Sequence, residues 1–266
     1  MHKKYIRVLT IAGSDSGGGA GIQADLKTIS ALKCFGMSAI TALTAQNTMG
    51  VQMIQSLPAE FIQAQINSVI SDIGVDAIKI GMLERKEIIY AIAKNIQAIR
   101  CPVVLDPVMF SKDGTQLISP DAINVMRDCL FPLSSIVTPN IPEAEYLAEF
   151  KIATIKDMES AAVKISKYGI KNVLIKGGHG TQKKCVDVLY QFDSHSFTYF
   201  SSKRIETKNT HGTGCTLSAA IAAELASGKE LHQAISSAKR FLLKAIGSGK
   251  DYMIGNGHGP INHLDN

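Results

Sequence analysis

The fold of this chain is decided near its C-terminal end, where residues 208–218 read KNTHGTGCTLS and lead into AAIAA at residues 219–223. Gly212 and Gly214 flank Thr213, so side chains do little to shield the backbone N–H groups here. The alanine-rich run is a strong helix former, and we expect a helix from Gly214 onward. The first amides of a helix have no carbonyl partner within it, and the helix dipole places roughly half a positive charge there. The stretch therefore predicts a phosphate-binding loop.

Cys215 lies at the mouth of this loop and allows two interpretations. A cysteine at the start of a helix is often only a small buried residue. The N-terminal dipole is also a setting that lowers the pKa of a thiol below its usual value of ~8.5. In the second case Cys215 takes a proton from an attacking hydroxyl group, which makes it a catalytic candidate.

The rest of the chain alternates short apolar runs with longer helical patterns. This alternation is typical of βαβ units and predicts an α/β fold with a mostly parallel sheet. No linker or repeat divides the sequence, so we expect one domain over residues 1–266, with a poorly ordered tail at residues 255–266. We expect strands at residues 5–11, 37–45, 51–57, 77–80, 103–105, 136–138 and 173–175, an antiparallel edge hairpin at 185–191 and 196–201, and closing helices at 214–227 and 231–246.

Composition narrows the class of protein. The net charge of +5 comes from 28 Lys and Arg against 23 Asp and Glu, scattered along 266 residues, which suits an anionic small molecule better than nucleic acid. The five cysteines form no C-x-x-C pair, so we expect neither a zinc site nor a disulfide framework. No apolar run approaches the ~18 residues of a membrane span. The N-terminal residues lack the features of a signal peptide, so we expect a cytoplasmic protein without a membrane partner.

Polar residues follow several predicted strands at the point where each strand ends. Asp106 follows the strand at residues 103–105, and Asn140 and Lys176 follow the next two strands. In a doubly wound sheet, ligands bind outside the carboxyl ends of the strands. The sequence therefore predicts that these residues meet at one ligand site.

Each of these residues also has a purely structural interpretation. Asp106 precedes Pro107 and is a natural turn former, or it positions Mg²⁺ together with Glu143. Asn140 and Glu143 lie three residues apart at a helix start, where both can face one site, or Glu143 pairs with the helix dipole alone. Lys176 is either solvated or directed toward the phosphate-binding loop.

A glycine-rich loop at residues 13–21 follows the first predicted strand. It fits G-x-G-x-x-A, but the acidic residue that a dinucleotide site needs about 20 positions later is missing, and the chain holds no P-loop motif. The loop is a flexible turn, or its small residues allow a substrate to approach closely.

Gln46 follows the second predicted strand and allows two interpretations as well. A glutamine offers a donor and an acceptor side by side, which matches a heteroaromatic amine better than a sugar. It is otherwise a turn residue. His211 is assigned no catalytic role.

The stretches that carry a family resemblance cover nearly the whole chain in order. They are AGSDSGGGAGIQADLKT at 12–28, TAQNT at 44–48, KIGML at 79–83, LDPVM at 105–109, TPNIPEA at 138–144, IKGGH at 175–179 and the loop at 208–218. This set resembles the ribokinase-like superfamily, and most closely the hydroxymethylpyrimidine/phosphomethylpyrimidine kinases of thiamine biosynthesis. Most sugar kinases of that superfamily have aspartate where this chain has Cys215, which argues against a sugar kinase.

The resemblance implies a three-layer fold with helices on both faces of the sheet. It also implies ATP-dependent phosphorylation of 4-amino-5-hydroxymethyl-2-methylpyrimidine, followed by phosphorylation of the monophosphate to the diphosphate, with ATP and Mg²⁺ as cofactors and a homodimer as the assembly. A pyridoxal kinase on the same scaffold is the nearest alternative, and a catalytically silent nucleotide-binding protein is a second.

The same resemblance implies a role for each candidate residue. The implied substrate-binding residues are Asp25, Gln46, Gly13, Met82 and Val108; the nucleotide-binding residues are Lys176, Asn140, Gly212 and Gly214; the metal-holding residues are Asp106 and Glu143; and the catalytic residues are Cys215, Lys176 and the anion hole of Gly212, Thr213 and Gly214.

Overall fold

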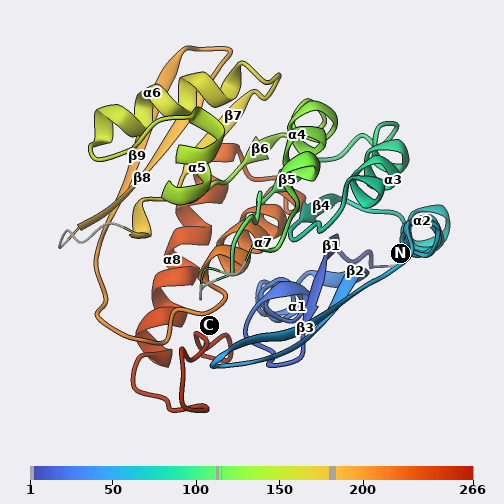
Figure 1. Ribbon diagram of the computed structural model, residues 1–266, viewed down its shortest axis with the longest axis horizontal. Helices are drawn as coiled ribbons and strands as arrows, with labels where there is room; N and C mark the ends of the chain where they lie inside the picture. The colour runs from blue at the N-terminus through green and yellow to red at the C-terminus, as the bar shows by residue number, and fades with distance from the viewer. Residues whose placement is uncertain (1–2, 112–113, 115, 180–183, 266) are drawn as a thin grey trace.

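A single nine-stranded sheet organises the part of the chain that the structure describes, namely residues 3–111, 114, 116–179 and 184–265 of a computed structural model (Figure 1). The strand order is β3-β2-β1-β4-β5-β6-β7-β8-β9. The strands are β1 (Arg7–Asp15), β2 (Phe35–Asn47), β3 (Gly50–Ser56), β4 (Ala77–Ile80), β5 (Val103–Leu105), β6 (Ile136–Val137), β7 (Asn172–Ile175), β8 (Lys184–Gln191) and β9 (Ser196–Lys203).

The sheet is parallel in its centre and antiparallel at both edges. All pairs from β2 to β7 are parallel, while β7, β8 and β9 pair antiparallel and confirm the predicted edge hairpin. At the opposite edge β3 pairs antiparallel with β2. The connection between β2 and β3 is too short for the crossover that a parallel pair needs, so the two strands form a hairpin.

Helices cover both faces of this sheet, which confirms the predicted three-layer α/β fold. The helices are α1 (Gly21–Ala31), α2 (Ala59–Ser68), α3 (Lys86–Ile96), α4 (Pro120–Cys129), α5 (Ile141–Ala148), α6 (Ile155–Ser166), α7 (Thr213–Ala226) and α8 (Leu231–Gly249), with a π-helical turn at Val69–Ile73 and a 3-10 turn at Gly177–His179.

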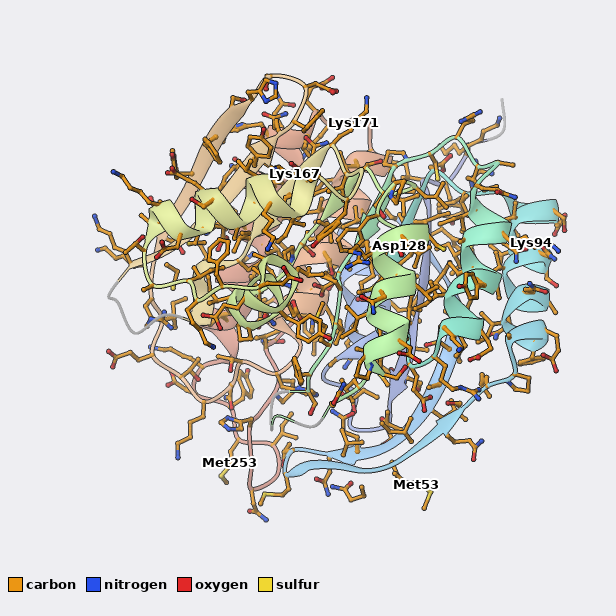
Figure 2. The ribbon with its side chains drawn as sticks, turned by 45° about the horizontal axis from the view of Figure 1, so that its top comes forward. Met53, Lys94, Asp128, Lys167, Lys171 and Met253 are labelled. Atoms are coloured by element: carbon orange, nitrogen blue, oxygen red, sulfur yellow. The ribbon has the colours of Figure 1, made fainter. Side chains whose placement is uncertain are left out.

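Alternate residues of each central strand point to opposite layers. Leu9 and Ile11 pack in the core under α2 to α6, whereas Val8 packs in the second core under α1, α7 and α8. Charged residues such as Lys94 and Asp128 lie on the outer surface of the helices (Figure 2). No helix in the described ranges has both the length and the apolar character that crossing a bilayer requires.

Two strands extend further toward the site than the sequence predicts. β1 continues through Gly13 to Asp15, and β2 continues to Asn47. The pairing register of β1 and β2 shifts between Ala12 and Ser14, and this irregularity lets the two strands stay paired beyond the expected loop start. Gln46 is therefore held by a strand.

The prediction of a poorly ordered C-terminal tail is wrong. The segment after α8 folds back over the loop that precedes α7, where the backbone N–H of His211 donates to the carbonyl of Gly259 at 3.1 Å. Ile261 is buried, and the buried His263 ring lies 2.9 Å from the Thr216 hydroxyl. Glycines and polar residues suggested disorder, but they form close backbone contacts instead.

The tail makes a prediction about acid stability. Burial lowers the pKa of His263 to about 4, below its ordinary value of 6.5. Its contribution to stability is therefore complete above pH 6.5 and is lost as the pH falls toward 4, by at most about 3 kcal/mol. We expect the urea midpoint, followed by circular dichroism, to fall less between pH 6.5 and 4.5 in His263→Gln than in the wild type. In His232→Gln, a substitution at an exposed position, the urea midpoint should fall as much as in the wild type. An equal fall of the midpoint in all three proteins would show that the lowered pKa of His263 does not contribute to acid stability.

Candidate active site

An ion pair brings together two of the predicted residues at the carboxyl edge of the sheet. Asp106 follows β5 and Lys176 follows β7, and the Lys176 ammonium donates to Asp106 Oδ1 at 2.6 Å. The Thr138 hydroxyl, at the end of β6 between them, donates to the same oxygen at 3.2 Å. Burial lowers the pKa of Lys176, but the Asp106 and Glu143 carboxylates outweigh this and raise it overall. Lys176 is therefore a fixed positive charge rather than a solvated surface residue.

The phosphate-binding loop lies directly beside this ion pair. A Cβ atom built on Gly214 would lie 3.4 Å from Lys176 Nζ and 3.5 Å from Asp106 Oδ2. α7 begins at Thr213, so the amides of its first turn lie next to the Lys176 ammonium. A helix N-terminus and a buried cation at the same place make a suitable seat for an anion.

Gly212 connects this loop to the glycine-rich loop after β1. Its φ of +81° lies in the left-handed region, and a Cβ atom there would lie 1.8 Å from the carbonyl oxygen of Gly19. Two backbone segments from opposite ends of the chain therefore touch, and no side chain fits between them.

Asn140 and Glu143 form a capping box at the start of α5. The Glu143 N–H donates to Asn140 Oδ1 at 2.9 Å, and the Asn140 N–H donates to Glu143 Oε2 at 2.8 Å. Glu143 is almost fully buried, and burial raises its pKa to about 7, with the Lys176 ammonium lowering it and Asp106 raising it. The structural interpretation of these residues holds, and it leaves Glu143 facing Asp106 and Lys176.

The donor set can be tested for its fit to Mg²⁺. The described residues contain no cluster of three or more His, Cys, Asp or Glu side chains suited to a metal ion. Mg²⁺ keeps several waters, however, and one or two carboxylates usually suffice when phosphates supply the other ligands. The like charges of Asp106 and Glu143 raise the pKa of Glu143, and a cation relieves such repulsion. The two carboxylates therefore fit a water-rich magnesium site.

Cys215 occupies the first turn of α7 but is not the low-pKa thiol that the dipole suggested. Burial raises the pKa of the thiol to about 11, although the nearby Lys79 ammonium and a backbone hydrogen bond from Gly21 lower it in part. The thiol is neutral in this state of the protein.

A buried ion pair that the sequence analysis missed lies near Cys215. Lys79 Nζ lies 2.7 Å from Asp25 Oδ2, and both side chains are completely buried. The Thr10 hydroxyl donates to the same carboxylate oxygen at 2.6 Å. Asp25 holds the pKa of Lys79 above its ordinary value although burial opposes this. The other oxygen of Asp25, Oδ1, has no hydrogen-bond partner among the described residues.

The other residues implied for the ring pocket lie at the ends of neighbouring strands. A Cβ atom on Gly13 would lie 3.1 Å from Met82 Sδ, which shows that these two residues are adjacent. Val108 is partly accessible and lies two residues after Asp106. Gln46 lines a small cavity of about 40 Å³ between the β2–β3 turn and His211, with room for only a few water molecules. Their contact with a substrate stays a prediction.

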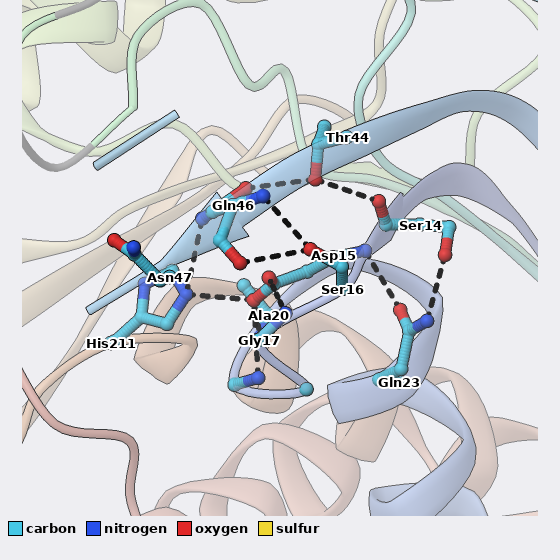
Figure 3. Close-up of polar contacts among 12 residues, drawn as sticks. Ser14, Asp15, Ser16, Gly17, Ala20, Gln23, Thr44, Gln46, Asn47 and His211 are labelled. Carbon is cyan, nitrogen blue, oxygen red and sulfur yellow. Dashed lines mark hydrogen bonds and ion pairs between the residues drawn. The ribbon is translucent and has the colours of Figure 1, made fainter. Parts of the chain in front are cut away.

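His211 and Asp15 are a second pair that the sequence analysis missed. Figure 3 shows the His211 ring between Gln46 and the glycine-rich loop, with its Nε2 2.8 Å from Asp15 Oδ2. The Gln46 amide lies 3.3 Å from the same ring nitrogen. Asp15 also accepts backbone hydrogen bonds from Gly17 and Ala20 at 2.8 Å. A loop histidine gave no periodic pattern from which this contact could be predicted.

Comparison with known proteins shows which family the chain resembles. Residues 15–262 match the family model described as phosphomethylpyrimidine kinase. The hydroxymethylpyrimidine/phosphomethylpyrimidine kinase of Rhizobium meliloti is 48% identical over 96% of each chain. A thiamine biosynthesis bifunctional protein of Geobacter sulfurreducens is 51% identical over 97% of this chain, which spans 52% of that protein's length. The ADP complex of Bacillus subtilis pyridoxal kinase superimposes with a TM-score of 0.88, at 40% identity over 98% of both chains.

The buried pair generates a prediction about stability. Lys79→Met leaves the Asp25 charge buried without its partner, and we expect a loss of about 3–5 kcal/mol in the free energy of unfolding, measured by urea titration. Lys79→Met combined with Asp25→Asn should recover part of this loss, because no uncompensated charge remains. The exposed Lys94→Met is the matched control and should stay within about 0.5 kcal/mol of the wild type. A loss below 1 kcal/mol for Lys79→Met would show that the pair contributes little.

Proposed function

The chain belongs to the phosphomethylpyrimidine kinase family, and on that basis we propose that it transfers the terminal phosphoryl group of ATP to 4-amino-5-hydroxymethyl-2-methylpyrimidine and then to the monophosphate. The observation that carries the proposal is the meeting of Lys176, Asp106 and Gly214 at the N-terminus of α7. Phosphoryl transfer depends mainly on positioning and on stabilisation of developing negative charge, which this arrangement supplies.

Each residue of the anion site has a role in this proposal. Gly212, Thr213 and Gly214 present backbone amides to the transferring phosphoryl group. Lys176 binds the nucleotide phosphates, and its ion pair with Asp106 holds the ammonium at the right place. Asn140 orients Glu143 through their hydrogen bonds and would lie beside the bound nucleotide.

Asp106 and Glu143 would hold Mg²⁺, directly or through water. The ion neutralises phosphate charge when it is bound. Glu143 is positioned for this task by the backbone N–H of Asn140 and, at 3.4 Å, by that of Met109.

Asp25, Gln46, Gly13, Met82 and Val108 would form the ring pocket. The unpartnered Asp25 Oδ1 supports this role, since a buried carboxylate oxygen without a donor is costly and a ligand amine can supply one. Cys215, which interacts electrostatically with Asp25, would contact the acceptor hydroxyl.

A single domain, a homodimeric assembly and a reducing cytoplasmic location complete the proposal. All five cysteines lie in the described ranges and are unpaired, which fits a reducing compartment.

Pyridoxal phosphorylation is a second candidate, because the similar Bacillus subtilis structure is named as a pyridoxal kinase. Gln46 favours the pyrimidine, since its amide offers a donor beside an acceptor and an aminopyrimidine has the same pair in its ring nitrogen and exocyclic amine.

Turnover of the two rings tests the function directly. With ATP and Mg²⁺, the purified protein should convert the hydroxymethylpyrimidine to the mono- and diphosphate, with kcat/KM at least about tenfold higher than for pyridoxal, which is the scale of one good hydrogen bond. Chromatography of the products measures both steps. Failure to form either phosphate would sink the proposed activity, and a reversed preference would favour pyridoxal.

The role of Cys215 has its own test. We expect Cys215→Ala to bind ATP like the wild type but to slow the first transfer by about 10² or more, the usual scale for loss of a general base. Because the thiol is neutral in the free protein, the wild-type rate should also rise with pH above neutrality if thiolate formation limits it. An unchanged kcat in Cys215→Ala would remove the thiol from the mechanism.

A further inference from the structure

We propose that His211 is a positioning residue that fixes the orientation of the Gln46 side-chain amide and thereby contributes to the choice of acceptor ring. The inference rests on the proposed function and deepens it, because it concerns how the ring pocket reads its substrate. It follows from the hydrogen-bonding capacity of four side chains in Figure 3, namely Asp15, Thr44, Gln46 and His211.

The first constraint comes from Thr44. Its hydroxyl oxygen lies 2.9 Å from the carbonyl oxygen of Ser14 and 3.1 Å from the atom that the structure places as Gln46 Oε1. A carbonyl can only accept, so the single hydroxyl proton goes to Ser14. The hydroxyl then needs a donor on its other side, and the Gln46 group that faces Thr44 must be the NH₂. The oxygen and nitrogen of an amide are assigned from such networks, and this network requires the two Gln46 atoms to exchange places.

The second constraint comes from His211 and is independent of the first. Burial alone raises the pKa of the Asp15 carboxyl, but the hydrogen bonds from His211 and the backbone outweigh it and lower the pKa overall. An ionised carboxylate only accepts, so His211 Nε2, at 2.8 Å, carries the proton that it donates. The Gln46 atom 3.3 Å from His211 Nε2, which the structure places as the amide nitrogen, must then be the carbonyl oxygen. Both contacts require the same orientation of the amide.

This orientation leaves a defined pair of groups for a ligand. Thr44 uses one N–H of Gln46 and His211 uses one lone pair, so one donor and one acceptor remain in a fixed order. Gln46 lines the small cavity beside His211. A ring with an acceptor nitrogen next to an amino group complements that order, whereas a ring without this adjacent pair does not.

The His211 ring is itself held on several sides, so it can act as a fixed reference. A Cβ atom on Gly19 would lie 2.4 Å from His211 Cδ2, so the ring packs against the glycine-rich loop. The His211 backbone N–H donates to the carbonyl of Gly259. Asp15, its partner, is locked by backbone N–H groups that include Gly19 at 3.1 Å.

A pair of substitutions of similar shape separates the N–H donor from the bulk of the side chain. His211→Gln can keep an N–H near Asp15 and Gln46, whereas His211→Met has similar length and no donor. We expect His211→Met to raise KM for the hydroxymethylpyrimidine about tenfold, to change kcat less than threefold and to leave KM for ATP unchanged. The KM of His211→Gln for the hydroxymethylpyrimidine should stay within about threefold of the wild-type value. His232→Met, at an exposed position on α8, should have the wild-type KM.

A double-mutant cycle tests whether His211 acts through Gln46. In a Gln46→Leu background, His211→Met should weaken pyrimidine binding less than twofold, measured by calorimetry without ATP, because the amide that it orients is gone. Additive effects of the two substitutions, or a His211→Gln variant as impaired as His211→Met, would overturn the proposal.

A measurement on the wild type covers the case in which a variant does not fold. In protein labelled with ¹⁵N at glutamine, the Gln46 NH₂ protons should show nuclear Overhauser effects to the Thr44 methyl group; effects to the His211 ring instead would overturn the proposal. This readout needs no turnover, so absence of kinase activity would refute the proposed function without deciding the amide orientation.

Discussion

The arrangement of the candidate active site depends on the buried ion pair between Lys79 and Asp25. It joins β4 in the sheet to α1 on its face, and both side chains are withdrawn completely from solvent. Removing two charges from water is costly, so such a pair persists only where its geometry is fixed and its charges are matched. Its ammonium also interacts electrostatically with Cys215 and Asp106. One interaction therefore joins α1 to the sheet and places a charge near both Asp106 and Cys215.

Asn140 and Glu143 show that a structural role and a functional role can belong to the same residues. The capping box satisfies amides at the start of α5, and it also turns the Glu143 carboxylate inward rather than toward solvent. In this position burial and the negative charge of Asp106 raise the pKa of Glu143 to about 7. The Asn140–Glu143 capping box thus starts α5 and also places the Glu143 carboxylate at the sheet edge, where a cation can bind it.

The parts of the site that could be predicted from the sequence are those tied to strand ends. Asp106 and Lys176 follow short buried strands, and parallel strands carry such residues to one edge, where they form an ion pair. Lys79 was missed although it interrupts an apolar strand, since its partner lies on a different element. His211 was missed because nothing local indicates a contact with Asp15. The ordered tail was missed because glycines that form close backbone contacts have the same composition as a flexible segment.

The contact between Asp15 and His211 has a consequence for the order of folding. It joins residues 196 positions apart, and bringing such distant segments together costs chain entropy that local contacts do not. The β8–β9 hairpin and the helices depend on near neighbours and can form early, whereas the glycine-rich loop and the loop before α7 meet only after the sheet between them has assembled. We therefore expect competence to bind a ligand to appear late, so that a folding intermediate with nearly native helix content would still lack a working site.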